Sequence, residues 1–209
     1  MSHSKQNSSD DNQKITLATY EKGVETYLKK TRSEISGGLK EYLDYILTKV
    51  PKDAHILEIG SATGRDADYI ESKGYNLTRS DAVQGFVEYI RSQGKVALIF
   101  NVLSDKLGQQ YDVVIATAVL LHLNTEQLAV ALENINTHLT INGVLILAVK
   151  QGDGEEYSFH KMKTGRYFKY WQQADLVKAV KAGGFLIDEC FINENSKWLI
   201  CIARKKQSE

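Results

Sequence analysis

The sequence predicts an α/β protein with a doubly wound, mostly parallel sheet of seven strands and helices on both faces. Short apolar segments with strand character alternate with amphipathic helical segments, which is typical of parallel sheets with right-handed crossovers. One turn, in HILEIGSATGR at residues 55–65, joins a strand to a helix through small residues alone. Near the C-terminus two apolar segments follow each other without a helix between them, which predicts a terminal hairpin that adds one antiparallel strand.

The hydrophobic pattern and the turn residues set the expected bounds of each element. The parallel strands are expected at residues 56–59, 76–80, 96–99, 111–116 and 144–149. The terminal hairpin is expected at residues 185–192 and 197–203, joined by the Asn-rich turn 193–196. The helices that accompany these strands are expected at residues 65–73, 83–92, 125–138 and 172–182.

The first 50 residues are predicted to form a polar tail and a helical cover for the core at 51–209, with 15–50 in the same domain as the core. Residues 1–14 are rich in Ser, Asn and Asp and are expected to be disordered. Helices are expected at about 16–30 and 39–49, interrupted by Gly37-Gly38 and followed by Pro51. Tyr20 and Tyr27 are candidate substrate-binding residues; the alternative is that they pack an amphipathic helix face.

Composition excludes several classes of function. The chain has 209 residues, of which 43% are hydrophobic, and its 26 basic and 26 acidic residues give a formal net charge of +0. This balance argues against bulk electrostatic binding to nucleic acid or to a membrane surface. No apolar run reaches transmembrane length, and the N-terminus lacks the apolar core of a signal peptide. Two cysteines without metal-site spacing predict a reduced, cytoplasmic protein with no metal site. The protein is expected to be a monomer or a homodimer.

The turn at residues 60–64 has the features of a cofactor site. Small residues allow a ligand to approach the backbone, and the N-terminus of the following helix favours an anionic group. The spacing of Gly60 and Gly64 matches the dinucleotide fingerprint only weakly. Glu58 precedes the turn and suits a ligand that carries an ammonium group, whereas Asp81 ends the second strand and can accept hydrogen bonds from both ribose hydroxyls. The Asp81 feature fits NAD and S-adenosylmethionine equally well.

Taken in order, these motifs resemble the class I S-adenosylmethionine-dependent methyltransferases. The resemblance begins with LEIGSATGR at 57–65, includes Asp81, and continues with YDVVIATAVLLHL at 111–123 and NGVLILAVK at 142–150. It extends through the two final strands and covers roughly residues 15–204. It implies a Rossmann-like fold, S-adenosyl-L-methionine as cofactor with S-adenosyl-L-homocysteine as product, and methyl transfer by in-line displacement to a small-molecule acceptor. The terminal hairpin also favours this family over a plain dinucleotide-binding domain.

The resemblance also implies a set of cofactor-binding residues. Glu58 and the turn would hold the methionine part, Asp81 the ribose and Asn101 the adenine amine. Ala62 replaces the usual middle glycine, and Asn101 stands where the family often has an acidic residue. The full set expected to bind the cofactor is Glu58, Gly60, Ser61, Ala62, Thr63, Gly64, Arg65, Asp81, Ala82, Asn101, Val102, Thr117, Ala118, Val119 and His122.

Two segments could carry catalytic or substrate-binding residues. His122 follows the fourth strand, and its ordinary near-neutral pKa would suit a general base; the alternative is a histidine that caps or packs the loop. The segment 150–171 is expected to be a long, aromatic loop that covers the substrate. In it, Arg166 could bind a carboxylate or phosphate, and Tyr167 or Tyr170 could form an aromatic wall; the alternative is that these residues only pack the loop. Catalytic roles are expected for His122, Arg166 and Tyr170.

Other functions stay open at this stage. Lys161, Lys163, Arg166 and Lys169 could follow the phosphates of an RNA, which would make the protein an RNA or tRNA methyltransferase, although a solvated basic rim is the simpler interpretation. A protein methyltransferase, a non-catalytic cofactor-binding protein of the same fold and a small NAD-binding module are the remaining alternatives. Nucleic acid is an unlikely partner on the net charge, and no membrane partner is expected.

Overall fold

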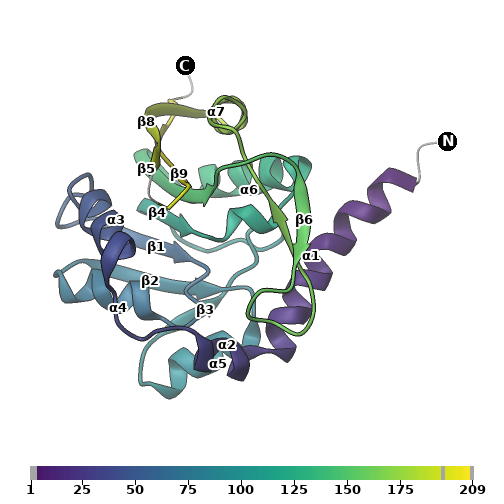
Figure 1. Ribbon diagram of the computed structural model, residues 1–209. Coiled ribbons are helices and arrows are strands. Elements are labelled where there is room, and N and C mark those ends of the chain that lie inside the picture. The colour runs from purple at the N-terminus through teal and green to yellow at the C-terminus, as the bar shows by residue number, and fades with distance from the viewer. Residues whose placement is uncertain (1–3, 194–195, 208–209) are drawn as a thin grey trace.

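The computed structural model describes residues 4–193 and 196–207, with side chains described from residue 12 on. Its central feature is a seven-stranded sheet with the order β3-β2-β1-β4-β5-β9-β8 (Figure 1). The strands of this sheet are β1 (His55–Ile59), β2 (Asn76–Asp81), β3 (Ala97–Ile99), β4 (Tyr111–Thr117), β5 (Leu139–Lys150), β8 (Phe185–Asn193) and β9 (Trp198–Lys205). All seven strands were expected from the sequence, and the predicted doubly wound α/β class is confirmed.

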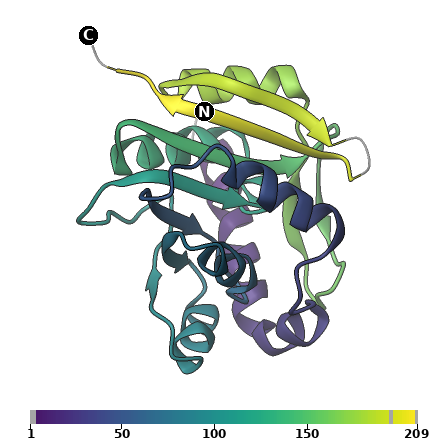
Figure 2. The same cartoon turned by 90° about the vertical axis from the view of Figure 1, so that its left-hand side faces the viewer.

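Strand β9 is the antiparallel member of the sheet. The pairs β1–β2, β2–β3, β1–β4 and β4–β5 are parallel, whereas β9 runs antiparallel to both β5 and β8. Figure 2 shows β8 and β9 as the outermost strands at one edge of the sheet. The predicted terminal hairpin is therefore confirmed. Of its expected turn, Glu194 and Asn195 lie outside the described residues.

Alternate side chains of the central strands enter two different cores, as expected for a sheet covered on both faces. On one face, Leu57, Val114 and Leu147 pack with residues of α6 and α7. On the other face, Ile56 and Val113 pack with residues of α3 and α4. The helices are α1 (Ser4–Lys22), α2 (Val24–Lys30), α3 (Gly37–Leu47), α4 (Arg65–Ser72), α5 (Gln84–Ser92), the short 3-10 turn η1 (Leu120–His122), α6 (Thr125–His138) and α7 (Gln173–Ala182).

Helix α1 begins earlier than the sequence predicted. Residues 1–3 lie outside the described residues, but from Ser4 on the expected disordered tail is part of α1, whose first turns extend away from the body of the molecule (Figure 1). Its later turns are anchored to the domain through Thr16 and Thr19, and a helix propagates easily from an anchored segment because nucleation is its costly step. The helix expected at 16–30 breaks at Gly23, where a Cβ atom would lie 2.2 Å from the Met162 Cε atom.

Two further boundaries differ for reasons that involve glycine. Helix α3 starts at Gly37, so the glycine pair opens the helix and does not merely precede it. Strand β5 starts at Leu139, five residues before the expected 144–149, and Leu139 already pairs with Tyr111 of β4. Asn142, which precedes the expected strand, takes a φ of 63° within a continuous strand whose register shifts against β4.

The expected loop at 150–171 contains a two-stranded antiparallel sheet, which corrects the sequence interpretation. Strand β6 (Glu155–Ser158) pairs with β7 (Arg166–Lys169). Helix α1 lies along this hairpin: the Tyr167 N–H donates to Thr16 Oγ1 at 3.0 Å, and Thr19 Oγ1 donates to the Gly165 carbonyl at 2.9 Å. Both threonines are buried. The N-terminal helix and the hairpin therefore form one unit.

No helix among the residues described here is long and apolar enough to cross a membrane.

Replacement of Thr16 by valine tests the connection between α1 and the hairpin. Thr16→Val keeps the shape of the side chain but leaves the buried Tyr167 N–H without its acceptor, which should lower the free energy of unfolding by about 1–3 kcal/mol. Urea denaturation measures the change. Thr164→Val, at an exposed position of the same hairpin, is the matched control and should change stability by less than about 0.5 kcal/mol. Equal stability of the two variants would contradict the proposed anchoring.

Candidate functional site

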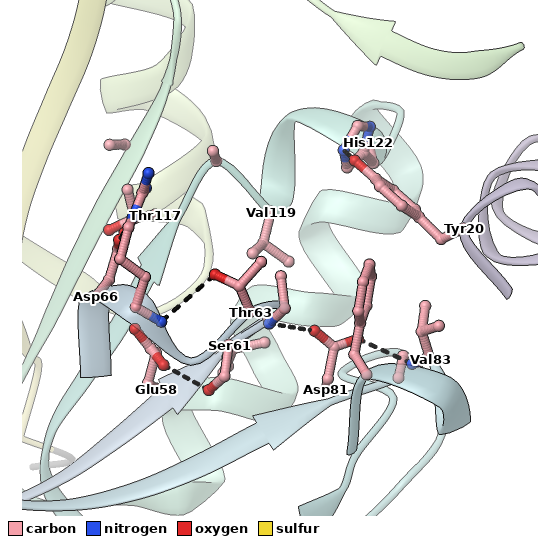
Figure 3. Close-up of a pocket in the computed structure, with 18 of the residues that line it drawn as sticks. Tyr20, Glu58, Ser61, Thr63, Asp66, Asp81, Val83, Thr117, Val119 and His122 are labelled. Carbon is pink, nitrogen blue, oxygen red and sulfur yellow. Dashed lines mark hydrogen bonds and ion pairs between the residues drawn. The ribbon is translucent and has the colours of Figure 1, made fainter. Parts of the chain in front are cut away.

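A cavity of about 500 Å³ lies at the carboxyl ends of the central strands. Figure 3 shows side chains from β1, β2, β4 and α1 that point into it. This volume is in the range of small-molecule sites, and the place is where ligands bind in doubly wound sheets. Of the expected cofactor-binding residues, all except Gly64 line it: Glu58, Gly60, Ser61, Ala62, Thr63, Arg65, Asp81, Ala82, Asn101, Val102, Thr117, Ala118, Val119 and His122.

The turn after β1 forms the floor of the cavity from backbone atoms. The N–H groups of Gly60 and Ser61 both donate to the Ser80 carbonyl, at 2.8 and 2.9 Å. Gly60, Ala62 and Gly64 have positive φ angles of 77°, 46° and 77°. A Cβ atom on Gly60 would lie 2.2 Å from the Val119 Cγ2 atom, so glycine is required there by close approach as well as by conformation.

Glu58 is a buried carboxylate at the end of β1. Its side chain accepts a hydrogen bond from the Ser61 hydroxyl. Burial, together with the negative charge of Asp66, raises the pKa of Glu58 to about 8. A cation that entered the cavity beside Glu58 would favour the ionised carboxylate. The site therefore fits a ligand with an ammonium group, as the sequence suggested.

Asp81, at the end of β2, is held by two backbone groups. The Ala62 N–H donates to its Oδ2 atom and the Val83 N–H to its Oδ1 atom, both at 2.9 Å. Burial raises its pKa to about 6 even though these hydrogen bonds favour the ionised form. Each carboxylate oxygen can accept a further bond, so Asp81 is oriented to receive two hydroxyl groups.

Asn101 follows β3 and also lines the cavity, but its amide oxygen is already in use. Its Oδ1 atom accepts from Gln13 Nε2 at 2.9 Å and from the Leu103 N–H at 3.0 Å. An adenine amine would have to compete with Gln13 for this oxygen. The Gln13 contact also shows that α1 reaches across the cavity as far as β3.

His122 lies in η1 between two hydrogen-bond partners. Its Nδ1 atom is 2.7 Å from the Tyr167 carbonyl oxygen, which can only accept, so Nδ1 carries the proton. Its Nε2 atom, 2.9 Å from the Tyr20 hydroxyl, must then accept a hydrogen bond from Tyr20. Burial lowers the pKa of His122 to about 4. In contrast with the near-neutral general base expected from the sequence, His122 is a neutral imidazole whose Nε2 atom already accepts a hydrogen bond from Tyr20.

The structure divides the expected substrate-binding residues into two groups. Tyr20 and Tyr27 line the cavity and, with Phe86 of α5, form an aromatic cluster with ring centroids 5.3–5.9 Å apart. Tyr167 and Tyr170 do not line it: the Tyr167 hydroxyl donates to Glu155 and the Tyr170 hydroxyl donates to Glu156. These two tyrosines pack the hairpin, as the alternative interpretation held.

Arg166 is also outside the cavity wall but lies directly behind it. The residue is 5% exposed. The Nη1 atom donates to the Tyr20 hydroxyl oxygen at 2.9 Å, and Nη2 donates to the His160 carbonyl at 2.5 Å. Tyr20 therefore accepts from Arg166 and donates to His122, which connects three residues that are far apart in the sequence.

Several cavity residues were not expected from the sequence. Tyr42 of α3 and Trp198 of β9 line the cavity, and the Tyr42 hydroxyl lies 3.0 Å from Thr117 Oγ1. Tyr42 belongs to the buried face of α3, in the helix expected at 39–49, and the spacing of such a face does not indicate which of its members borders a cavity.

Comparison with known proteins gives a consistent result. The model of a protein family described as "Tellurite resistance protein TehB" matches residues 27–187. The Haemophilus influenzae protein named "Probable S-adenosyl-L-methionine-dependent methyltransferase TehB" is 22% identical over 175 residues, which cover 78% of this chain and 60% of that protein. The chain thus spans about 60% of the length of these curated relatives.

Solved structures share the fold at low sequence identity. A 1,6-didemethyltoxoflavin-N1-methyltransferase from Burkholderia thailandensis, solved with its substrate and S-adenosylhomocysteine, superposes with a TM-score of 0.75 at 15% identity, covering 95% of this chain and 91% of that one. A TehB-like methyltransferase from Corynebacterium glutamicum superposes with a TM-score of 0.66 at 17% identity, covering 91% and 98% of the two chains. At these identities the similarity shows a common fold.

Replacement of Gly60 by alanine tests the close approach at the floor of the cavity. Gly60 and Gly94 have nearly the same φ, 77° and 76°, but a Cβ on Gly94 would meet nothing within 4 Å. Both Gly60→Ala and Gly94→Ala should lose about 1–2 kcal/mol for the positive φ. Gly60→Ala should lose a further 1–3 kcal/mol, roughly, because its Cβ overpacks against Val119. Urea denaturation compares the two variants, and equal losses would contradict the close approach.

Proposed function

The chain belongs to the TehB family, and from this membership we propose that it is an S-adenosylmethionine-dependent methyltransferase that acts on a small-molecule acceptor. The predicted class I fold is confirmed by the family match and by the sheet, with its antiparallel strand β9. The observation that carries the proposal is the pair of buried carboxylates Glu58 and Asp81 at adjacent strand ends. Among the described residues Glu58 makes no ion pair, and Asp81 presents oxygens for two hydroxyls, which matches an amino acid joined to a ribose.

In this proposal the chain binds and orients, and the sulfonium cofactor supplies the activated methyl group. Glu58 would pair with the cofactor's ammonium group and Asp81 would accept from its ribose hydroxyls. Gly60 and its neighbours allow the ligand to lie against the backbone. Tyr20 and His122, on the wall opposite the floor, would orient the acceptor, since alignment of the reacting atoms is the main requirement for an in-line displacement.

The enclosure of the cavity supports a small acceptor. Glu58 and Asp81 are 4% and 6% exposed, and α1 with the β6–β7 hairpin covers the side on which Tyr20 lies. Of the four basic residues that could have followed an RNA backbone, Arg166 is buried against Tyr20, which removes it from a solvated rim. The related Burkholderia thailandensis enzyme likewise has a small organic molecule as its substrate.

Substitution of Asp81 tests the ribose site. Asp81→Ala should weaken binding of S-adenosylhomocysteine by about thirty-fold to a thousand-fold, because charge-assisted hydrogen bonds to two hydroxyls contribute on the order of 2–4 kcal/mol. Isothermal titration calorimetry measures the dissociation constant. Asp175→Ala, which removes the same charge from an exposed position of α7, should bind like the unmodified protein. Unchanged affinity in Asp81→Ala would rule out this site for the cofactor.

The raised pKa of Glu58 predicts that cofactor binding releases a proton. Its carboxyl is mostly protonated at pH 7 in the free protein and should ionise beside the incoming ammonium group. Affinity for S-adenosylhomocysteine should therefore rise with pH up to about 8 and level off above it. Calorimetric titrations at pH 7 in phosphate and in Tris should give different heats of binding, because the two buffers take up the released proton with different enthalpies. The difference should correspond to the release of close to one proton per site.

The matched control for this titration is Glu58→Gln, which has nothing to ionise. It should bind more weakly and with the same heat in both buffers after correction for buffer ionisation. Binding by the unmodified protein without proton release would exclude Glu58 as the partner of the ammonium group.

A further inference from the structure

The two cysteines of the chain lie directly opposite each other on the last two strands of the sheet. Cys190 of β8 pairs with Cys201 of β9, and the adjacent pair Phe191–Ile200 continues the same antiparallel register. Both thiols are free. Residues that face each other in this way have their side chains on the same face of the sheet. The two thiols are therefore neighbours on one face of the β8–β9 hairpin.

This pairing has the dimensions that a disulfide requires. The Cα atoms of directly opposite residues in antiparallel strands lie about 4.5–5.5 Å apart, and disulfides join Cα atoms that are about 4.4–6.8 Å apart. A bond between Cys190 and Cys201 would thus need rotation of the two side chains and little movement of the backbone.

The backbone at both cysteines is held by neighbouring elements. Strand β9 lies between β5 and β8, and Cys201 also pairs with Leu147 of β5. The Cys190 carbonyl accepts a hydrogen bond from Gln173 Nε2 of α7 at 2.6 Å. The two residues are therefore kept opposite each other by contacts that involve neither sulfur atom.

The two thiols differ in their access to solvent. Cys190 is half-buried, whereas Cys201 is fully buried in the core on the α6 and α7 side of the sheet. A hydrogen bond from Cys201 lowers the pKa of the Cys190 thiol, and the same bond together with burial raises the pKa of the Cys201 thiol. Since the thiolate is the attacking form, a reagent in solution reacts first with Cys190.

We propose that Cys190 and Cys201 are a redox-active pair that closes reversibly to a disulfide on reaction with a low-molecular-weight disulfide such as oxidised glutathione. The Cys190 thiolate attacks one sulfur of that molecule, forms a mixed disulfide and releases one glutathione thiolate. The Cys201 sulfur, once deprotonated, attacks the Cys190 sulfur and releases the second glutathione. Two protein thiols are oxidised to one disulfide, one glutathione disulfide is reduced, and the two thiol protons pass through solvent to the two released glutathiones.

The bridge would lie next to the cavity without entering it. Ile200 of β9 lines the cavity, whereas Cys201, the next residue along the strand, belongs to the core on the opposite face of the sheet. The inference does not depend on the proposed methyltransferase function, because the state of the two thiols can be measured without cofactor or turnover.

Intact mass spectrometry measures this state directly. The folded protein is equilibrated with mixtures of reduced and oxidised glutathione, quenched with acid, and then treated with N-ethylmaleimide in urea to label free thiols. The expected product has lost two hydrogens, carries no glutathione and takes up no label, and dithiothreitol should restore two reactive thiols. A folded protein that keeps both thiols free in oxidised glutathione, or that stops at a glutathione adduct, would contradict the proposal.

Single-cysteine variants test the order of the two steps. Cys201→Ala should accumulate one glutathione on Cys190, because no second thiol is present to release it. Cys190→Ala keeps only the buried thiol and should react with oxidised glutathione about tenfold more slowly or less. Equal rates for the two folded variants would contradict the assignment of Cys190 as the attacking thiol.

A comparison of folded and urea-unfolded protein needs no variant and shows whether the fold itself favours the bridge. If the strands hold the thiols opposite each other, the equilibrium constant for bridge formation against glutathione should be larger by about tenfold or more in the folded protein. An equal or smaller constant would overturn the proposal, and the two cysteines would then be only small side chains of the core.

Discussion

The distance between the β1 turn and the β4 end is set by the contact of the Gly60 backbone with Val119, and the cavity depends on this contact. With no side chain on Gly60, the turn lies against its neighbour and its N–H groups bond to the Ser80 carbonyl of β2. Asp81 then connects the same turn to the start of α5 through the Ala62 and Val83 N–H groups. The floor of the site is therefore made of backbone atoms whose positions are fixed by three neighbouring strands.

The opposite wall is built on a different principle. It consists of side chains from segments that are distant in the sequence: Tyr20 from α1 and His122 from η1, with Arg166 from β7 behind them. The direction of each hydrogen bond in this set follows from that of its neighbour, starting from the Tyr167 carbonyl, which can only accept. The orientation of Tyr20 depends on these partners and not on the floor. The wall can therefore change while the floor is kept, which would allow relatives of this fold to bind different acceptors.

The floor was predictable from the sequence, whereas for the wall the sequence indicated Tyr20, His122 and Arg166 as candidates but not the hydrogen bonds that join them. Glu58, the turn and Asp81 are local features: a strand, a small-residue turn and an acidic strand end have their geometry encoded within a few residues. Arg166 and Tyr167 were both placed in a substrate-covering loop, Arg166 to bind an anionic group and Tyr167 to form an aromatic wall. In the structure they belong to β7, whose alternation places Arg166 and Phe168 toward His122 and Tyr167 toward Glu155. Tyr42 and Trp198 came from elements that were correctly predicted, but only tertiary packing brings them to one cavity.

The partnership of α1 with the hairpin bears on how the protein is made on the ribosome. Thr19 bonds to the Gly165 carbonyl across 146 residues of sequence, so α1 emerges long before its docking partner exists. At synthesis rates of about 5–20 residues per second, the interval is roughly 7 to 30 s. The sheet floor from β1 to β4 can form in that time, while the polar helix waits in solvent. The wall therefore joins α1 to a hairpin that is synthesised well after the strands that form the floor.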